Sequence, residues 1–203
     1  MASVFLVVVP VFFQAPLVRS LPWLSLTLTG SWLMAGISLI SRGNSRPWGD
    51  LLIGFTWTWL AGSIYWGWFR WEPFIHLPIE SLGIPIVLIA LVRGKGRIGS
   101  YFYLGSLLGT AVTDLYIYWT DLLPLWRQVM RVDPDWAPVI LREAATTLQS
   151  PLAFMKGAVL AVGLLLVGTL PLRSKQSCWW AFSGAVLSTL IVDMLFLTSA
   201  LLV

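Results

Sequence analysis

The sequence predicts an all-α fold, a polytopic transmembrane helical bundle that forms a single integral membrane domain over residues 1–203. Hydrophobic residues make up 58% of the chain and charged residues 11%, against about 25% charged residues in soluble domains. The mean hydropathy is +0.82. Apolar runs of about 20 residues recur, and a helix of that length crosses a bilayer core of about 30 Å. The lipid bilayer is therefore the first expected partner.

About seven apolar segments are long enough to cross the membrane. The first, 3–18, is short and contains Pro10 and Pro16, so we expect a kinked span. It lacks the basic start and the small-residue cleavage site of a signal peptide, which favours a retained segment. If it does not cross, six spans remain. These six are predicted at 21–41, 51–68, 77–92, 98–119, 151–172 and 179–203.

The segment 121–150 differs from the spans because it mixes tryptophans with charges. Its aromatic and charged residues include Trp126, Arg127, Arg131, Asp133, Asp135, Trp136, Arg142 and Glu143. Tryptophan beside charge is typical of helices that lie along a membrane surface. We therefore expect an interfacial helical segment there.

Charge in the loops predicts the orientation. One side of a seven-span bundle collects basic residues in short loops, with Asp50 as its acid: Arg42, Arg46, Arg93, Lys95, Arg97, Arg173 and Lys175. Short loops rich in Lys and Arg face the cytoplasm. The sequence therefore predicts a cytoplasmic N-terminus and a lumenal or periplasmic C-terminus.

Ionisable residues gather around the start of the fourth span. The stretch 65–88 is otherwise apolar and carries Arg70, Glu72, His76 and Glu80. An ionisable group inside a bilayer costs several kcal/mol unless it is paired or hydrated, so by default it marks a functional site. We expect the first three in the loop just above the span, and Glu80 about one turn inside it. These four residues are candidates for binding a ligand or a partner.

The fifth and seventh spans share a pattern of small, hydroxyl and acidic residues. The pattern is Gly105, Gly109, Thr110 and Asp114 in the fifth span and Gly184, Ser188, Thr189 and Asp193 in the seventh. Small residues four apart allow a neighbouring helix to approach closely. Each threonine precedes its aspartate by one turn, where the hydroxyl can bond the carboxyl. An internal duplication is one explanation, and chance similarity between apolar helices is the other.

Asp114 and Asp193 are also candidate residues, because both are predicted to lie inside the membrane. At 1.5 Å per residue both lie about 6–9 Å below the outer interface, and Glu80 lies about 5 Å below it. Two interpretations remain open. The acids either bond to the neighbouring threonines, to Arg70 or to backbone groups and hold helices together, or they line a water-accessible pocket that opens outward.

The single histidine and two mid-span tryptophans complete the candidates. A lone His76 without partners at metal spacing predicts no metal site; it is an interfacial hydrogen-bonding residue or, alternatively, an axial ligand to a pigment. No motif implies a cofactor. Trp57 and Trp59 lie in mid-span, away from the interfacial belts where tryptophan is expected, so they are candidates for lining a cavity or a protein contact.

Several classes of function have no support in the sequence. It contains no nucleophile elbow, P-loop, dinucleotide fingerprint or HExxH motif. Carboxylates alone do not specify a reaction, so we assign no catalytic residue and favour a protein that is not an enzyme. The single Cys178 excludes a disulfide framework. The net charge of +4 is modest and forms no stripe for nucleic acid.

Three long blocks carry a resemblance to a known family: WTWLAGSIYWGWFRWEPFIHLPIE, YFYLGSLLGTAVTDLY and WWAFSGAVLSTLIVD. They resemble a cyanobacterial family of membrane proteins catalogued only as a domain of unknown function, over most of the chain. The resemblance implies a thylakoid or plasma membrane and a photosynthetic role. A weaker likeness is to the small membrane-embedded substrate-binding subunits of energy-coupling-factor vitamin transporters.

Three functions follow as hypotheses. The first is a non-catalytic accessory or assembly protein, bound to subunits of a cyanobacterial membrane complex. The second is the substrate-binding membrane component of a transporter, with Arg70, Glu80, Asp114 and Asp193 lining an outward pocket. The third is a membrane enzyme or pigment-binding protein that uses His76.

Overall fold

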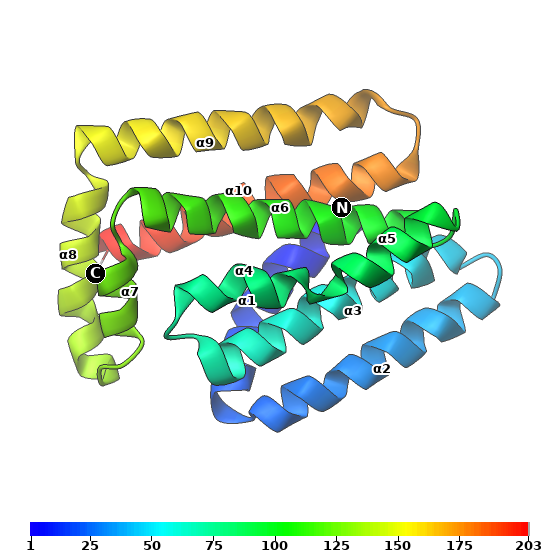
Figure 1. The fold of residues 1–203 in the computed structure, drawn as a ribbon, viewed down its shortest axis with the longest axis horizontal. Helices are drawn as coiled ribbons and strands as arrows, with labels where there is room; N and C mark the ends of the chain where they lie inside the picture. Colours follow the sequence, from blue (N-terminus) through cyan, green and yellow to red (C-terminus); the bar gives the residue numbers. More distant parts are fainter. Residues whose placement is uncertain (203) are drawn as a thin grey trace.

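The computed structural model describes the backbone of residues 1–202 and the side chains of residues 1–198. Every regular element in this part of the chain is helical, which confirms the all-α prediction. The last residue of the predicted span 179–203 lies outside the described part. The helices are α1 (Ala2–Ser20), α2 (Pro22–Ser41), α3 (Arg46–Ile64), α4 (His76–Glu80), α5 (Ile84–Val92), α6 (Arg97–Trp119), α7 (Leu123–Val129), α8 (Ala137–Leu148), α9 (Pro151–Thr169) and α10 (Ser177–Leu202) (Figure 1).

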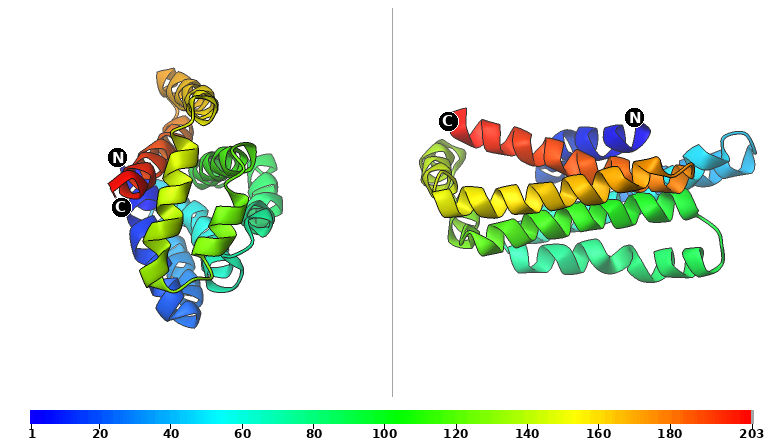
Figure 2. Two further views of the ribbon diagram at one scale, coloured as in Figure 1. Left: turned by 90° about the vertical axis from the view of Figure 1, so that its left-hand side faces the viewer. Right: turned by 90° about the horizontal axis from the view of Figure 1, so that it is seen from above.

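The long helices form an up-and-down bundle. Helices α2, α3, α6, α9 and α10 run along its length, and α4 and α5 together make one further pass (Figures 1 and 2). Helices α7 and α8 instead cross one end of the bundle, which we call the capped end. The predicted interfacial segment 121–150 is therefore helical and lies across the ends of the long helices. The C-terminal end of α10 lies at the capped end, and α1 begins partway along the bundle.

Within the described residues, five segments have the length and hydropathy of a membrane span: Ala2–Ser20, Pro22–Ser41, Pro73–Val92, Pro151–Arg173 and Ser177–Thr198. The first of them, α1, runs through both Pro10 and Pro16. Helices α3 and α6 are more polar, but they contain much of the buried core, including Phe55, Trp59 and Phe102. A helix surrounded by other helices does not need a lipid-compatible surface. The protein is thus an integral, multi-pass membrane protein.

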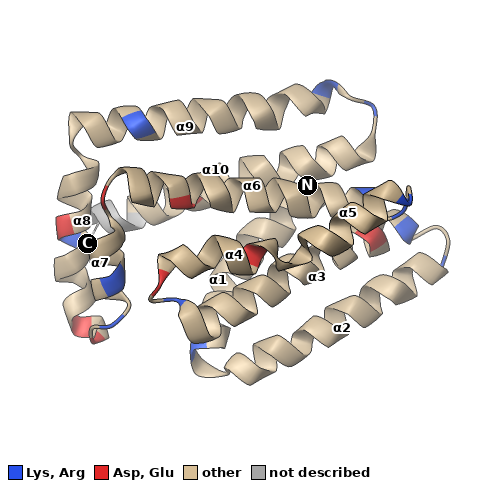
Figure 3. Cartoon of the chain, in the orientation of Figure 1, with Lys and Arg blue, Asp and Glu red and all other residues tan. Residues whose placement is uncertain are grey.

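Basic residues gather at the end of the bundle opposite α7 and α8 (Figure 3). We call this the basic end. It contains the turns between α2 and α3, between α5 and α6, and between α9 and α10. The loops that the sequence assigns to one side of the membrane therefore do lie at one end of the fold.

Glycines let α3, α6 and α10 pack with their backbones in contact. A Cβ added to Gly54 of α3 would clash with the backbone of Gly99 in α6. A Cβ added to Gly105 would lie 2.6 Å from the carbonyl oxygen of Phe182 in α10. Such small-residue faces are what brings membrane helices close. The small residues of the fifth span, Gly105 and Gly109, therefore face α10, whereas Gly184 of the seventh span faces Ser3 of α1.

Trp59 belongs to the core. Its ring is 6% exposed and lies 5.7 Å from the ring of Trp32 and 5.8 Å from that of Phe55. Its Nε1 donates to the carbonyl of Ser25. Trp59 therefore fills the space between α2 and α3, whereas Trp57 is half-buried on the same helix.

The close crossing of α3 and α6 predicts that one added methyl group at the contact lowers the stability of the fold. Gly54→Ala places a Cβ against the Gly99 backbone, and we expect a loss of about 1–3 kcal/mol from overpacking. Gly163→Ala on α9 is the control, because a Cβ there meets nothing within 4 Å. Thermal unfolding of both variants in detergent tests this. Equal stability of the two variants would contradict the close crossing.

Candidate functional site

The fourth pass is a broken helix. The 3₁₀ turns Pro73–Ile75 and Ser81–Gly83 flank α4, and α5 follows the second turn. Pro73, Pro78 and Pro85 lack the backbone N–H that a continuous helix would use. The pass predicted at 77–92 is therefore longer than expected and interrupted. His76, which we predicted in a loop, is the first residue of α4.

Tyr103 bridges the second break. Its buried hydroxyl, on α6, donates to the carbonyl of Glu80 and accepts from the N–H of Gly83 at 3.1 Å. Backbone groups left unpaired in an apolar layer cost several kcal/mol. One side chain of α6 therefore satisfies a donor and an acceptor that the break exposes, and this fixes the position of α4.

Four side chains meet beside α4 and form what we call the acid–imidazole cluster: Tyr65, His76, Glu80 and Asp114. The Nδ1 atom of His76 lies 3.0 Å from Oδ1 of Asp114 on α6. Its Nε2 atom lies 3.9 Å from Oε1 of Glu80, one turn further along α4. The ring of Tyr65 stacks on the imidazole with centroids 4.0 Å apart. Tyr65 begins a π-helical turn, Tyr65–Phe69, at the end of α3, and such turns are frequent at functional sites.

The cluster is buried and rich in acid. The side chains of Asp114 and Glu80 are 5% and 9% exposed, and that of His76 is 18% exposed. The second oxygen of Asp114, Oδ2, is buried and has no hydrogen-bond partner. Among the described residues, no Lys or Arg lies within salt-bridge distance of either carboxylate. Two acids therefore share one imidazole.

A second set of contacts covers the cluster at the capped end. Arg127 of α7 donates to Glu72 at 2.8 Å, and its guanidinium lies 5.6 Å from the centre of the Phe74 ring. The indole N–H of Trp126 donates to the carbonyl of Arg70 at 2.9 Å. We call Arg70, Glu72, Trp126 and Arg127 the cover. The Arg70 guanidinium points to the carbonyl of Trp66, at 3.4 Å, so the alternative in which Arg70 pairs with a buried acid is not the arrangement found.

The bonds that the sequence allows from Thr110 to Asp114 and from Thr189 to Asp193 do not form either. Asp193 of α10 accepts from Thr113 of α6 at 3.0 Å. Thr189 instead donates to the carbonyl of Ala185, the backbone bond that a helical threonine makes one turn back. The partner of Asp114 is His76 and not Thr110, which is half-buried on α6. The sequence thus identified the acids but not their partners.

Sequence analysis missed Tyr65, Thr113 and Arg127. Tyr65 looks like one more aromatic residue at the end of an apolar helix, and Arg127 like one of several interfacial charges. No spacing rule connects Arg127 to Glu72, since 55 residues separate them. Only the fold brings these side chains to the site.

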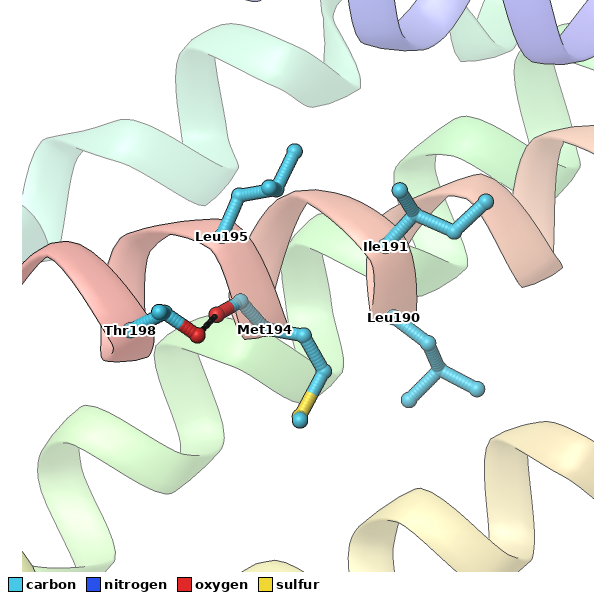
Figure 4. A pocket seen from close by; sticks show the side chains of 5 residues that line it. All are labelled: Leu190, Ile191, Met194, Leu195 and Thr198. Atoms are coloured by element: carbon cyan, nitrogen blue, oxygen red, sulfur yellow. Dashed lines mark hydrogen bonds between the residues drawn. The ribbon is translucent and has the colours of Figure 1, made fainter.

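Two shallow grooves lie on the outer surface of the bundle, and neither contains a candidate residue. One is formed by α10 alone (Figure 4) and is lined by Leu190, Ile191, Met194, Leu195 and Thr198. The Thr198 hydroxyl is already bonded to the carbonyl of Met194. The other groove lies between α1, α3 and α10 and is lined by Met1, Ala2, Val4, Phe5, Val8, Val9, Trp48 and Ile191. Both have apolar walls that suit lipid.

The fold and the site together define a class: a polytopic α-helical membrane protein with a largely buried polar cluster beneath one end. Residues 3–201 match the family described as "Protein of unknown function (DUF3120)". The chain belongs to that family. No curated protein and no solved structure matched the sequence.

Tyr103→Phe tests the bridged break. The variant leaves the Glu80 carbonyl and the Gly83 N–H without their partner, and an unsatisfied buried group costs about 1–3 kcal/mol. Tyr101→Phe is the control, because the Tyr101 ring packs edge-on against Trp179 and that contact is kept. Thermal unfolding in detergent should show a lower midpoint for Tyr103→Phe alone. Identical midpoints would contradict the bridging role.

The ion pair between Glu72 and Arg127 should make the stability of the cover sensitive to acid. The hydrogen bond from Arg127 lowers the pKa of Glu72 below its ordinary value of 4.5. A carboxyl with a lowered folded-state pKa adds stability above its ordinary pKa, and that stability is lost as the pH falls through the lowered value. We expect wild type to lose up to about 1 kcal/mol in this window. Glu72→Gln should lack that loss in thermal unfolding below pH 4.5, and an equal loss in both proteins would contradict the contact.

Proposed function

We propose that the protein is a non-catalytic accessory subunit that binds and stabilises a larger membrane complex. The observation that carries this proposal is the surface of α9. Its outward side chains form a continuous apolar face: Leu152, Phe154, Met155, Val159, Val162, Leu165, Leu166 and Val167. Only Ala153, Leu164 and Gly168 of α9 are buried.

Helix α9 also projects from the body of the bundle at one edge (Figure 2). A transmembrane helix of a partner subunit fits such a face, because outward glycine allows close approach. Gly163 provides this space at mid-helix, since a Cβ there meets nothing within 4 Å. Lipid alone would also cover α9, so the proposal requires a test in the native membrane.

The polar groups favour this proposal over solute transport. The acid–imidazole cluster is paired within the chain, and the cover lies over it at the capped end. The two surface grooves have apolar linings. A solute site needs polar side chains that converge on a cavity. In this proposal the buried acids interact with other side chains of the same chain and do not bind a transported solute.

The setting we propose is a cyanobacterial thylakoid or plasma membrane, with a photosynthetic complex as the partner. The support is the resemblance of the tryptophan-rich blocks to a cyanobacterial membrane family. The basic end then faces the cytoplasm, because short loops rich in Lys and Arg are retained there. The capped end faces the lumen or periplasm.

A steric substitution tests the docking face. Gly163→Trp should fill the mid-helix space on α9 and reduce co-purification of partner subunits at least about tenfold, which corresponds to about 1.4 kcal/mol of binding free energy. Gly30→Trp on α2 is the matched control, because Gly30 also has nothing within 4 Å of an added Cβ. The measurement is mass spectrometry of complexes purified gently from native membranes.

Two outcomes oppose the accessory role, and a third opposes α9 as the docking face. If the protein purifies alone from the native membrane, it is not an accessory subunit. If it purifies with a small molecule whose binding is lost in Asp114→Asn, the protein is a transport component and not an accessory subunit. Unchanged partner binding in Gly163→Trp would exclude α9 as the docking face.

A further inference from the structure

The acid–imidazole cluster contains more carboxylate than the chain neutralises. Glu80 and Asp114 are both at least nine-tenths buried, and among the residues that the structure describes His76 is their only basic neighbour. With both acids ionised, even a protonated imidazole leaves one uncompensated negative charge. An uncompensated buried charge is unfavourable because it has lost its hydration, so a further bound proton lowers the free energy of the cluster.

The oxygen atoms of the cluster provide the place for that proton. Oδ2 of Asp114 is buried without a hydrogen-bond partner. The nearest approach of Glu80 to the imidazole is 3.9 Å, longer than a hydrogen bond. The described residues contain no group of three or more His, Cys, Asp or Glu side chains arranged to hold a metal ion. A proton needs only one of these oxygens.

We propose that His76, Glu80 and Asp114 form a proton-binding site that exchanges protons with water through His76. The imidazole is the most exposed of the three side chains, at 18%. Its two nitrogens face different acids, with Nδ1 toward Asp114 and Nε2 toward Glu80. An imidazole can therefore receive a proton at one nitrogen and release another from the opposite nitrogen.

The exchange balances in two steps. In the first, with both acids ionised and the ring neutral, hydronium gives one proton to Nε2 and becomes water, and the imidazole becomes positive. In the second, Nδ1 passes its own proton to Oδ1 of Asp114, 3.0 Å away. The ring is then neutral again with its proton on Nε2, and Asp114 is neutral. The charge of the cluster changes from minus two to minus one. A second proton from hydronium then protonates the ring at Nδ1, and the imidazolium beside ionised Glu80 leaves the cluster neutral.

The surrounding elements leave the site acidic. Tyr65 covers one face of the imidazole, Tyr118 of α6 donates to the carbonyl of Pro73, and Tyr103 donates to the Glu80 carbonyl. Asp193 lies on the neighbouring α10 and is bonded to Thr113. In the cover, Arg127 is paired with Glu72, and the Arg70 guanidinium points to Trp66. Within the described part of the chain, these contacts give the buried acids no cation other than His76.

The single histidine of the chain makes the site directly observable. The protein is labelled with ring-¹⁵N histidine, purified through a tag without histidine and placed in lipid nanodiscs. The ¹⁵N shifts of Nδ1 and Nε2 are followed from about pH 4 to pH 10. We expect a reversible titration of His76 whose midpoint moves by about one pH unit or more in Glu80→Gln and in Asp114→Asn.

Glu72→Gln is the matched control, because Glu72 is bonded to Arg127 in the cover and not to His76. Its His76 midpoint should equal that of wild type. The proposal is overturned if His76 does not titrate, or if the midpoint is the same in wild type and both cluster variants. If the cluster variants do not fold, infrared spectra of wild type decide: a protonated carboxyl band that varies with pH supports the site, and its absence overturns it.

This inference is independent of the accessory role. The Gly163→Trp experiment addresses partner binding on α9, and the histidine titration addresses a cluster between α3, α4 and α6. Each can fail while the other succeeds.

Discussion

The requirement that a chain satisfy its own polar groups inside an apolar layer governs this structure. The fourth pass breaks at Ser81–Gly83, and the Tyr103 hydroxyl serves both the Glu80 carbonyl and the Gly83 N–H. Because no water competes there, such bonds have no replacement when they are lost. The break in turn lets α4 present His76 and Glu80 toward Asp114 of α6. The position of the acid–imidazole cluster therefore depends on the break at Ser81–Gly83 and on the Tyr103 hydroxyl that bridges it.

The acid–imidazole cluster and its cover differ in exposure and in what they do. The Glu72–Arg127 pair, with side chains 27% and 37% exposed, holds α7 against the Pro73–Ile75 turn. A pair this exposed contributes little to stability. The buried cluster is different, because two carboxylates there depend on one imidazole. Its free energy is therefore sensitive to proton number, which is the physical basis of the proposed site.

Helix packing divides the bundle into a close-packed centre and a lipid-accessible edge. Glycines at 54, 99 and 105 bring the backbones of α3, α6 and α10 together. Gly163 on α9 has open space on its outward side instead. The same residue type thus serves two purposes, and only its position relative to neighbouring helices separates them. A partner helix on α9 would use the second kind of glycine as the bundle itself uses the first.

Composition, apolar run length and charge placement alone determined the all-α class, the membrane setting and the separate character of the segment 121–150, but not the break in the fourth pass. Those properties follow from apolar length and charge spacing, which are local. The sequence also singled out His76, Glu80 and Asp114 as ionisable groups in apolar surroundings. It did not supply their partners, because the pairs His76–Asp114, Thr113–Asp193 and Glu72–Arg127 join residues 38, 80 and 55 positions apart. Hydrogen bonds act over about 3 Å, so only the tertiary structure decided which acids are paired and which remain open to a proton.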